Sequence, residues 1–322
     1  MLDRISILSK RKEPLKKGGT MTKLIYGTDP EMFALDNRDS VIPPVLLRKD
    51  LGIYARPDPE HPEHPVFLSM NGGYIHEDGA AFEFCITPSP DWEELFDKIQ
   101  YLKSEFERRV LSNASMWCDG KLHPRPTAKW DVDRWKHRGP SFAYATRFGC
   151  DKDYDASKED DDDEGEPEED ASMHPFRYSG GHAHFSGSEA IIKYPKLAIH
   201  SLMLTSGLAA IAGTDVPDQE RTRTYRYGRP ERYRVQTYSG LFNNIPNTHI
   251  GIEYRTPSSR WTKSKEHARS VFEWGTRGIL EILETGRTDE FMSIFGEHAR
   301  KAILSSDKET ALQILNEMEN ML

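Results

Sequence analysis

The chain has little cysteine and no long apolar run. Its 322 residues include three cysteines, Cys85, Cys118 and Cys150, which lie far apart and form no CxxC pair. This usage argues against a disulfide framework or a zinc knuckle and is typical of a reducing compartment. No segment has the roughly 20 consecutive apolar residues that cross a bilayer, and the N-terminus lacks the apolar core of a signal peptide. We therefore expect a cytoplasmic protein with no membrane partner.

One window of the chain lacks basic residues altogether. Residues 159–170 read EDDDDEGEPEED, which is ten acids without a lysine or arginine. Because the whole chain has a formal net charge of −9, the remainder is close to neutral. Overall charge therefore argues neither for a nucleic acid partner nor against an anionic substrate. We expect a disordered acidic loop at about 157–172 and a flexible basic tail at 1–20.

The spacing of apolar residues changes along the chain and predicts both strands and helices. Residues 40–73 and 116–150 have no clear period and are expected to be irregular. Capping boxes are expected at Asp91 with Glu94 and at Ser306 with Glu309. No regular βαβ alternation is visible, so we predict one α+β domain over 21–322 with a mainly antiparallel sheet. Strands are expected within 23–36, 80–86, 177–187 and 248–256, and helices at about 91–113, about 188–212 and in two or three segments at the C-terminus.

Functional side chains recur at alternate positions in these expected strands. The pairs or runs are Asp29 with Glu31, residues 77–83, His182 with His184, and Glu253 with Arg255. In a strand, residues i and i+2 point to the same face, so each segment presents two such groups to one side. Carboxylates and imidazoles bind divalent metals, and arginine binds a carboxylate or phosphate. The pattern predicts a metal and nucleotide site built across a sheet.

Each segment also has a structural interpretation. Asp29 could cap a turn, and Asp78-Gly79 is an ordinary turn signal, so only one of Glu77 and Asp78 need be functional. Glu83 stands in an apolar run and needs a partner, either a structural arginine or a metal. His182 and His184 are framed by glycines, which allow a ligand to approach closely, so they could be metal or phosphate ligands or structural hydrogen-bond donors.

The abundance of carboxylates favours magnesium or manganese over a zinc hydrolase. Arginines interleaved with tyrosines between 220 and 238 could form a nucleic-acid surface or clamp the phosphates of a nucleotide.

In this order, the segments resemble the glutamine synthetase and glutamate–cysteine ligase superfamily. They are most similar to its phage-associated branch of carboxylate–amine ligases, the phiEco32-like amidoligases. The resemblance rests on GTDPEMFALD, IHEDGAAFEF, SGGHAHFS and GIEYRTPSSRW, with FGCDKDYDA and the stretches around Tyr227-Gly228 and Tyr233-Arg234 similar to the phage branch. It covers about residues 27–261.

The resemblance implies a glutamine-synthetase-like catalytic domain that uses ATP and magnesium or manganese to join a carboxylate to an amine through an acyl phosphate. Two features depart from glutamine synthetase: Asp29 stands where those enzymes carry glutamate, and no β-grasp domain is evident before Gly27. A non-catalytic nucleotide- or metal-binding protein, or a virion-associated protein, with the same fold is the alternative. The resemblance implies two metal sites. Glu31 and Glu83 would bind one metal, with Glu77 or Asp78 assisting, and Asp29, His182 and Glu253 would bind the metal that bridges the ATP phosphates. It further implies that His184 and Ser186 lie near the nucleotide, that Arg255 binds the substrate carboxylate, and that phosphate is contacted by Arg226, Arg232 and Arg234.

Overall fold

The computed structural model describes residues 23–49, 52, 55, 65–138, 142, 144–148, 153–158, 169–238 and 249–322. The expected basic tail, most of the expected acidic loop and Cys150 lie outside the described residues.

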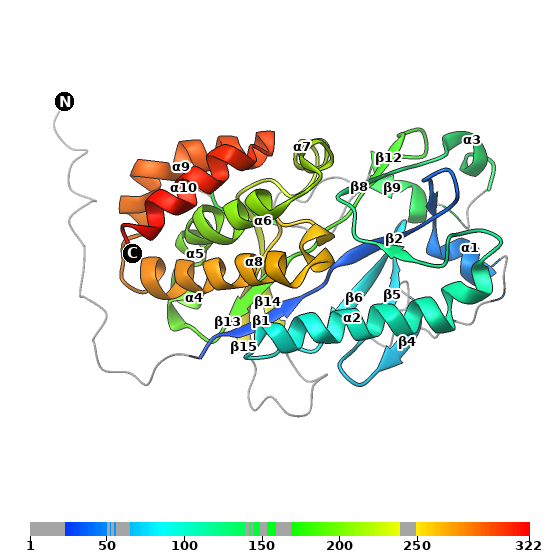
Figure 1. Ribbon diagram of the computed structural model, residues 1–322, viewed down its shortest axis with the longest axis horizontal. Coiled ribbons are helices and arrows are strands. Elements are labelled where there is room, and N and C mark those ends of the chain that lie inside the picture. Colours follow the sequence, from blue (N-terminus) through cyan, green and yellow to red (C-terminus); the bar gives the residue numbers. More distant parts are fainter. Residues whose placement is uncertain are drawn as a thin grey trace.

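Two antiparallel sheets form the framework (Figure 1). In the first sheet the strand order is β1 (Ile25–Thr28), β13 (Ala183–Ser186), β15 (His249–Tyr254), β14 (Arg232–Tyr238) and β10 (Tyr154–Asp155). In the second sheet it is β3 (Val41–Ile42), β2 (Glu31–Leu35), β6 (Ala81–Ile86), β5 (Gly73–Asp78) and β4 (Val66–Met70), with β7 (Leu122–His123) also paired to β2. Two small antiparallel pairs complete the described strands, β8 (Thr127–Lys129) with β12 (Phe176–Tyr178) and β9 (Arg147–Phe148) with β11 (Glu169–Asp170).

The chain passes from the first sheet to the second at Pro30. Asp29 and Pro30 separate β1 from β2, and these strands pair with different neighbours, β13 and β6. Proline has no backbone N–H and suits the point where a ladder ends. Asp29 therefore lies next to the end of the first sheet, and Glu31 begins a strand of the second.

Helices cover both sheets. Helix α2 (Trp92–Arg109) packs on β5 and β6 and against α8 (Lys265–Arg277). The helices α4 (Glu189–Lys193), α5 (Pro195–Leu202) and α6 (Leu208–Gly213) gather with α8, α9 (Thr288–Ser305) and α10 (Lys308–Glu319) beside the first sheet (Figure 1). The remaining described helices are α1 (Pro44–Lys49), α3 (Val132–Trp135), α7 (Pro217–Thr224), the 3-10 turns η1 (Leu111–Ala114), η3 (Tyr144–Thr146) and η5 (Ser259–Lys263), and the π-helical turns η4 (Met203–Gly207) and η6 (Gly278–Leu283).

The mixed α+β architecture with mainly antiparallel sheets is as predicted. Residues 40–73 are more regular than expected, because they contain β3, α1 and β4. The expected helix at 188–212 is interrupted at Tyr194, since a residue before proline is driven out of the helical region. Within the described part of the chain, one segment, Pro195–Gly213, is long and apolar enough to cross a membrane, but 72% of it is buried in the molecule, as in a core helix.

Both expected capping boxes are wrong in detail. The side chain of Asp91 does cap α2, at the backbone N–H of Glu93, but Glu94 accepts a hydrogen bond from Ser89 instead of completing the box. At the C-terminus, Ser306 has φ 54° and ends α9, while Asp307 caps α10 by accepting from the Thr310 N–H at 3.1 Å. The local turn between the two helices selects the cap, and the sequence spacing did not reveal it.

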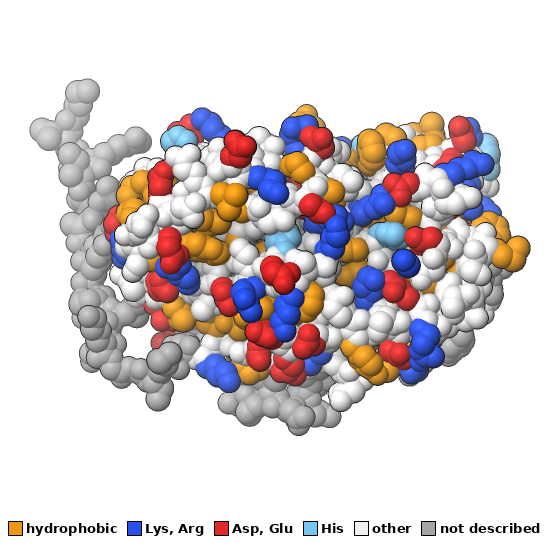
Figure 2. Space-filling view, viewed as in Figure 1, with side chains coloured by type: hydrophobic (Ala, Val, Ile, Leu, Met, Phe, Trp, Pro, Cys, Tyr) orange, Lys and Arg blue, Asp and Glu red, His pale blue; other side chains and the backbone are white. Residues whose placement is uncertain are grey.

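On the face shown in Figure 2, acidic and basic side chains are interspersed. This agrees with the near-neutral charge of the chain outside 159–170.

Candidate metal centre

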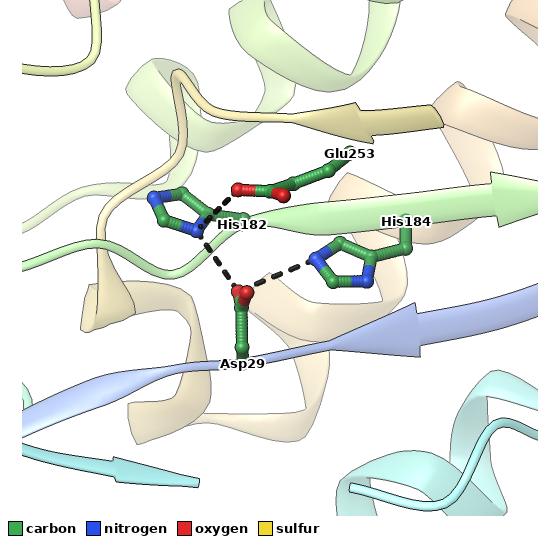
Figure 3. A group of neighbouring side chains, drawn as sticks. All are labelled: Asp29, His182, His184 and Glu253. Carbon is green, nitrogen blue, oxygen red and sulfur yellow. Dashed lines mark ion pairs between the residues drawn. The ribbon is translucent and has the colours of Figure 1, made fainter. Parts of the chain in front are cut away.

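Four side chains from strands of the first sheet or the residues next to them meet in one group, which we call the histidine group: Asp29, His182, His184 and Glu253 (Figure 3). One ligand atom from each lies within 4.8 Å of the others. The strand register explains the meeting, because His184 on β13 stands opposite both Gly27 on β1 and Glu253 on β15. Sequence analysis had placed three of these residues at one metal, and the structure adds His184, which was expected near the nucleotide.

The contacts within the histidine group are short. Oδ1 of Asp29 lies 2.9 Å from Nδ1 of His182 and 3.3 Å from Nε2 of His184. Nδ1 of His182 also lies 3.1 Å from Oε1 of Glu253. Both imidazoles and Glu253 are buried. The group thus places two carboxylates and two ring nitrogens around a small buried volume.

Glycines permit this close approach. A Cβ at Gly180 would lie 2.3 Å from Nε2 of His182, and one at Gly181 would lie 2.4 Å from the backbone of Ser258. No real side chain tolerates such distances, so the GG preceding His182 is a steric requirement of the site.

The electrostatics of the histidine group favour a positive charge at its centre. Burial alone would lower the pKa of His182, but Asp29 and the contact with Glu253 outweigh it and raise that pKa to about 9. Burial would likewise raise the pKa of Asp29 and of Glu253. The two histidines overcome this for Asp29, and Arg255 does so for Glu253, so both carboxyls have a pKa below the usual range.

The donors of the histidine group fit a divalent metal ion. Carboxylate oxygens suit magnesium and manganese, and imidazole nitrogens suit transition metals. Oδ1 of Asp29 and Nδ1 of His182 are buried and face each other without making an aligned hydrogen bond. A metal ion would satisfy both atoms at once.

A second group of acids lies on the second sheet. Glu31 on β2 stands directly opposite Glu83 on β6, and Asp78 shares this face because it pairs with Ala81, two residues from Glu83. Burial and then the charge of Asp78 raise the pKa of Glu31 to about 7, and the same two causes raise the pKa of Glu83 well above normal. Such crowding of buried acids is costly unless a cation or a proton is shared among them.

Two polar contacts hold these acids in place. Oε2 of Glu31 accepts a hydrogen bond from the Gly180 N–H at 2.8 Å, which links the two groups through the glycine segment. Oε2 of Glu83 lies 3.0 Å from Nε2 of His76. As predicted, Phe82 and Phe84 pack in the core on the face opposite Glu83.

Of the two candidate acids Glu77 and Asp78, the structure brings only Asp78 to this face. Glu77 points to the other side of β5, where its Oε2 lies 3.2 Å from Nη2 of Arg48 on α1. Glu77 is therefore placed in a structural ion pair, away from the other predicted metal ligands. The alternation of a strand requires adjacent residues to diverge in this way.

The predicted arginines differ in their surroundings. Arg255 is buried, and its guanidinium contacts Glu253, the hydroxyl of Tyr227 at 2.9 Å and Asp153 at 3.4 Å. Arg232 is also buried and lies 3.0 Å from Asp153. Arg234 retains a side chain that is 21% exposed and lies 4.0 Å from Glu253. Arg226 follows α7 and is half-buried. Of these four arginines, Arg234 lies near the histidine group and is also partly exposed to solvent.

Three residues of the site were not assigned a role from the sequence. Nε2 of Gln236 donates to Oε2 of Glu253 at 2.5 Å, and its position two residues after Arg234 on β14 was the available signal. Asp153 binds two arginines, and Tyr227 contacts both His182 and Arg255. Ser186, expected near the nucleotide, is buried two residues beyond His184 on the same strand face.

Comparison of the chain with protein-family models and with curated proteins gives no match.

Proposed function

We propose that this protein is an ATP-dependent carboxylate–amine ligase that forms an amide through an acyl phosphate. One observation carries the proposal. Segments separated by more than 200 residues, each similar to a motif of the glutamine-synthetase-like ligases, contribute side chains to one group of possible metal ligands and to an adjoining group of acids. A glutamine-synthetase-like fold and the phage-associated branch are parts of the same proposal.

Each group would hold one divalent ion, magnesium or manganese. The histidine group would hold the ion that contacts the ATP phosphates, and Glu31, Asp78 and Glu83 would hold the other. Such ions neutralise the charge that develops as the γ-phosphoryl group moves.

The chain's own residues would orient the reactants. The guanidinium of Arg234 would contact the phosphoryl group that is transferred, and Arg226 would contact the nucleotide. Gln236 and Arg255 hold Glu253 from two sides and so fix its direction. In the first step an oxygen of the substrate carboxylate attacks the γ-phosphorus, and the bond to the β-phosphate oxygen breaks to release ADP. In the second step an amine nitrogen attacks the acyl carbon, loses a proton and displaces inorganic phosphate.

The test is ADP release from ATP and Mn²⁺ or Mg²⁺ with panels of acids and amines. We expect release that requires one acid and one amine together, and that is lost in Glu83→Gln and Glu253→Gln. The matched control is Glu317→Gln, which alters an exposed glutamate on α10. Folded wild-type protein that binds ATP and metal yet releases no ADP with any pair would refute the ligase.

Binding without chemistry is the second candidate, and Asp153 favours it. Its carboxylate contacts Arg232 and Arg255, two guanidiniums that the family resemblance expects at phosphate and substrate. In that case ATP and metal bind but no acid is activated. An Asp153→Asn variant that gained ADP release would instead show that this carboxylate restrains a competent enzyme.

Nucleic-acid binding by the arginines between 220 and 238 stays a prediction. Arg223 and Arg232 are buried in this run and present no guanidinium to a phosphate backbone, whereas Arg221 and Arg229 are exposed.

A further inference from the structure

The segment after α7 places Tyr227 between Arg255 and His182. The ring of Tyr227 lies 5.0 Å from the guanidinium carbon of Arg223 and 5.6 Å from that of Arg255, measured to the ring centre. Its hydroxyl lies 3.0 Å from Nε2 of His182 and 2.9 Å from Nη2 of Arg255.

Arg223 makes this position rigid. Its buried guanidinium donates to the carbonyl of Ser179 at 2.5 Å, just before the glycine segment, and to that of Thr256 at 2.7 Å, just after β15. It therefore fastens α7 to the two strands that carry His182 and Glu253. At Gly228 φ is +72° and a Cβ would lie 2.4 Å from Nη1 of Arg223, so the chain after Tyr227 has little freedom.

The two ring nitrogens of His182 face different partners. Nδ1 faces Asp29 and Glu253 in the histidine group, and Nε2 faces the hydroxyl of Tyr227. Arginine can only donate, so Arg255 uses one lone pair of the Tyr227 oxygen. The same oxygen can accept from an N–H at Nε2 of His182, 3.0 Å away, and a proton at Nε2 would leave the Nδ1 lone pair to bind a metal ion.

We infer that Tyr227 is a positioning residue that holds His182 as the Nε2–H tautomer and thereby aims Nδ1 into the histidine group. The inference rests on the proposed function, because it needs a metal ion in that group. It gives Tyr227 no contact with the reacting atoms.

The variant Tyr227→Phe tests the inference, because it keeps the ring between the two arginines and removes only the hydroxyl. We expect Mn²⁺ affinity, measured from the paramagnetic resonance signal of the free ion, to fall by about 10–100-fold, as for other partners of metal-bound histidines. The matched control is Tyr225→Phe, which removes the hydroxyl of a tyrosine that is 85% exposed in the same segment. Its affinity should equal that of the wild type.

A second measurement needs no variant. In wild-type protein saturated with diamagnetic Mg²⁺, nitrogen NMR of the imidazole rings should show the proton of His182 on Nε2. A proton on Nδ1 would overturn the inference even if Tyr227→Phe did not fold. Unchanged Mn²⁺ affinity in folded Tyr227→Phe would overturn it as well. Wild-type protein that binds neither ion would refute the proposed metal site itself, which is a separate result.

Discussion

Arg234 differs from Arg232 and Arg255 in being partly exposed while it lies close to the histidine group. It lies beside Glu253 on the adjacent strand, in the register row that also contains His184. Arg232 and Arg255 are buried against Asp153 instead. At the scale of single residues, the site therefore combines one partly exposed arginine with two that are buried against Asp153.

Replacement of Arg234 tests this separation. For the proposed ligase, we expect Arg234→Ala to lower kcat/KM for ATP by about 100-fold or more, because a preorganised cation would be lost where negative charge would develop. ADP release under initial-rate conditions measures the effect. Arg221→Ala removes an exposed arginine of the same run and should leave the rate unchanged. Equal rates for the two variants would contradict the role of Arg234.

The crowded acids of the second sheet predict a pH dependence. The pKa of Glu31 is raised from 4.5 to about 7, so the folded protein binds more protons than the unfolded chain between these values. The free energy of unfolding of the metal-free protein should therefore contain a contribution that falls as the pH rises from 4.5 through 7. Glu31→Gln should flatten this fall, as measured by urea unfolding in EDTA, whereas Glu317→Gln should leave it unchanged. A steeper or unaltered fall in Glu31→Gln would contradict the assignment.

At the scale of elements, the junction of α9 and α10 shows how a cap is selected. Ser306 adopts the left-handed conformation that ends α9, and the next residue, Asp307, becomes the N-cap of α10. Serine and aspartate are both good caps by composition. The buried hydroxyl of Ser306 has no hydrogen-bond partner among the described residues, whereas Asp307 accepts from the Thr310 N–H, so the residue after the left-handed turn supplies the cap.

This junction predicts that two neighbouring substitutions change the free energy of unfolding differently. Asp307→Ala should lower the free energy of unfolding by about 1 kcal/mol, since the first turn of α10 loses its acceptor. Ser306→Gly should be neutral or stabilising, because glycine adopts positive φ without strain. Urea denaturation of both variants measures the difference. A larger loss in Ser306→Gly than in Asp307→Ala would restore the cap predicted from the sequence.

At the scale of the whole molecule, the two groups of candidate metal ligands lie at the boundary between the two sheets. The histidine group belongs to the first sheet, the group of Glu31, Asp78 and Glu83 to the second, and the Gly180 N–H joins them through Glu31. Metal ions in both groups would remove the repulsion among acids at this boundary. Metal ions would therefore stabilise both sheets, and the contact between them, against unfolding.

Metal should accordingly stabilise the entire fold. At a Mn²⁺ concentration of about 100 times Kd, one site adds about 2.7 kcal/mol to the free energy of unfolding. We expect a single urea transition that moves to higher urea with Mn²⁺ and returns with EDTA. His184→Ala should reduce the shift, and His298→Ala, on the exposed side of α9, should not. A shift of equal size in His184→Ala would place the stabilising ion elsewhere.

The sequence by itself determined the local directions of the site. The alternation of Phe82, Glu83 and Phe84 gave the buried and the functional faces of β6, and the His182, Ala183, His184 spacing gave two imidazoles on one face. These features depend only on the two-residue period of a strand and were predictable. The mixed α+β class followed similarly from changes in period.

Only the tertiary structure decided which groups meet. Strand register placed His184 with Glu253 and directed Asp78, not Glu77, toward Glu31. The contacts of Asp153, Gln236 and Tyr227 join segments that are distant in sequence or on separate strands. No local period contains such information, because it arises from the pairing and packing of whole elements.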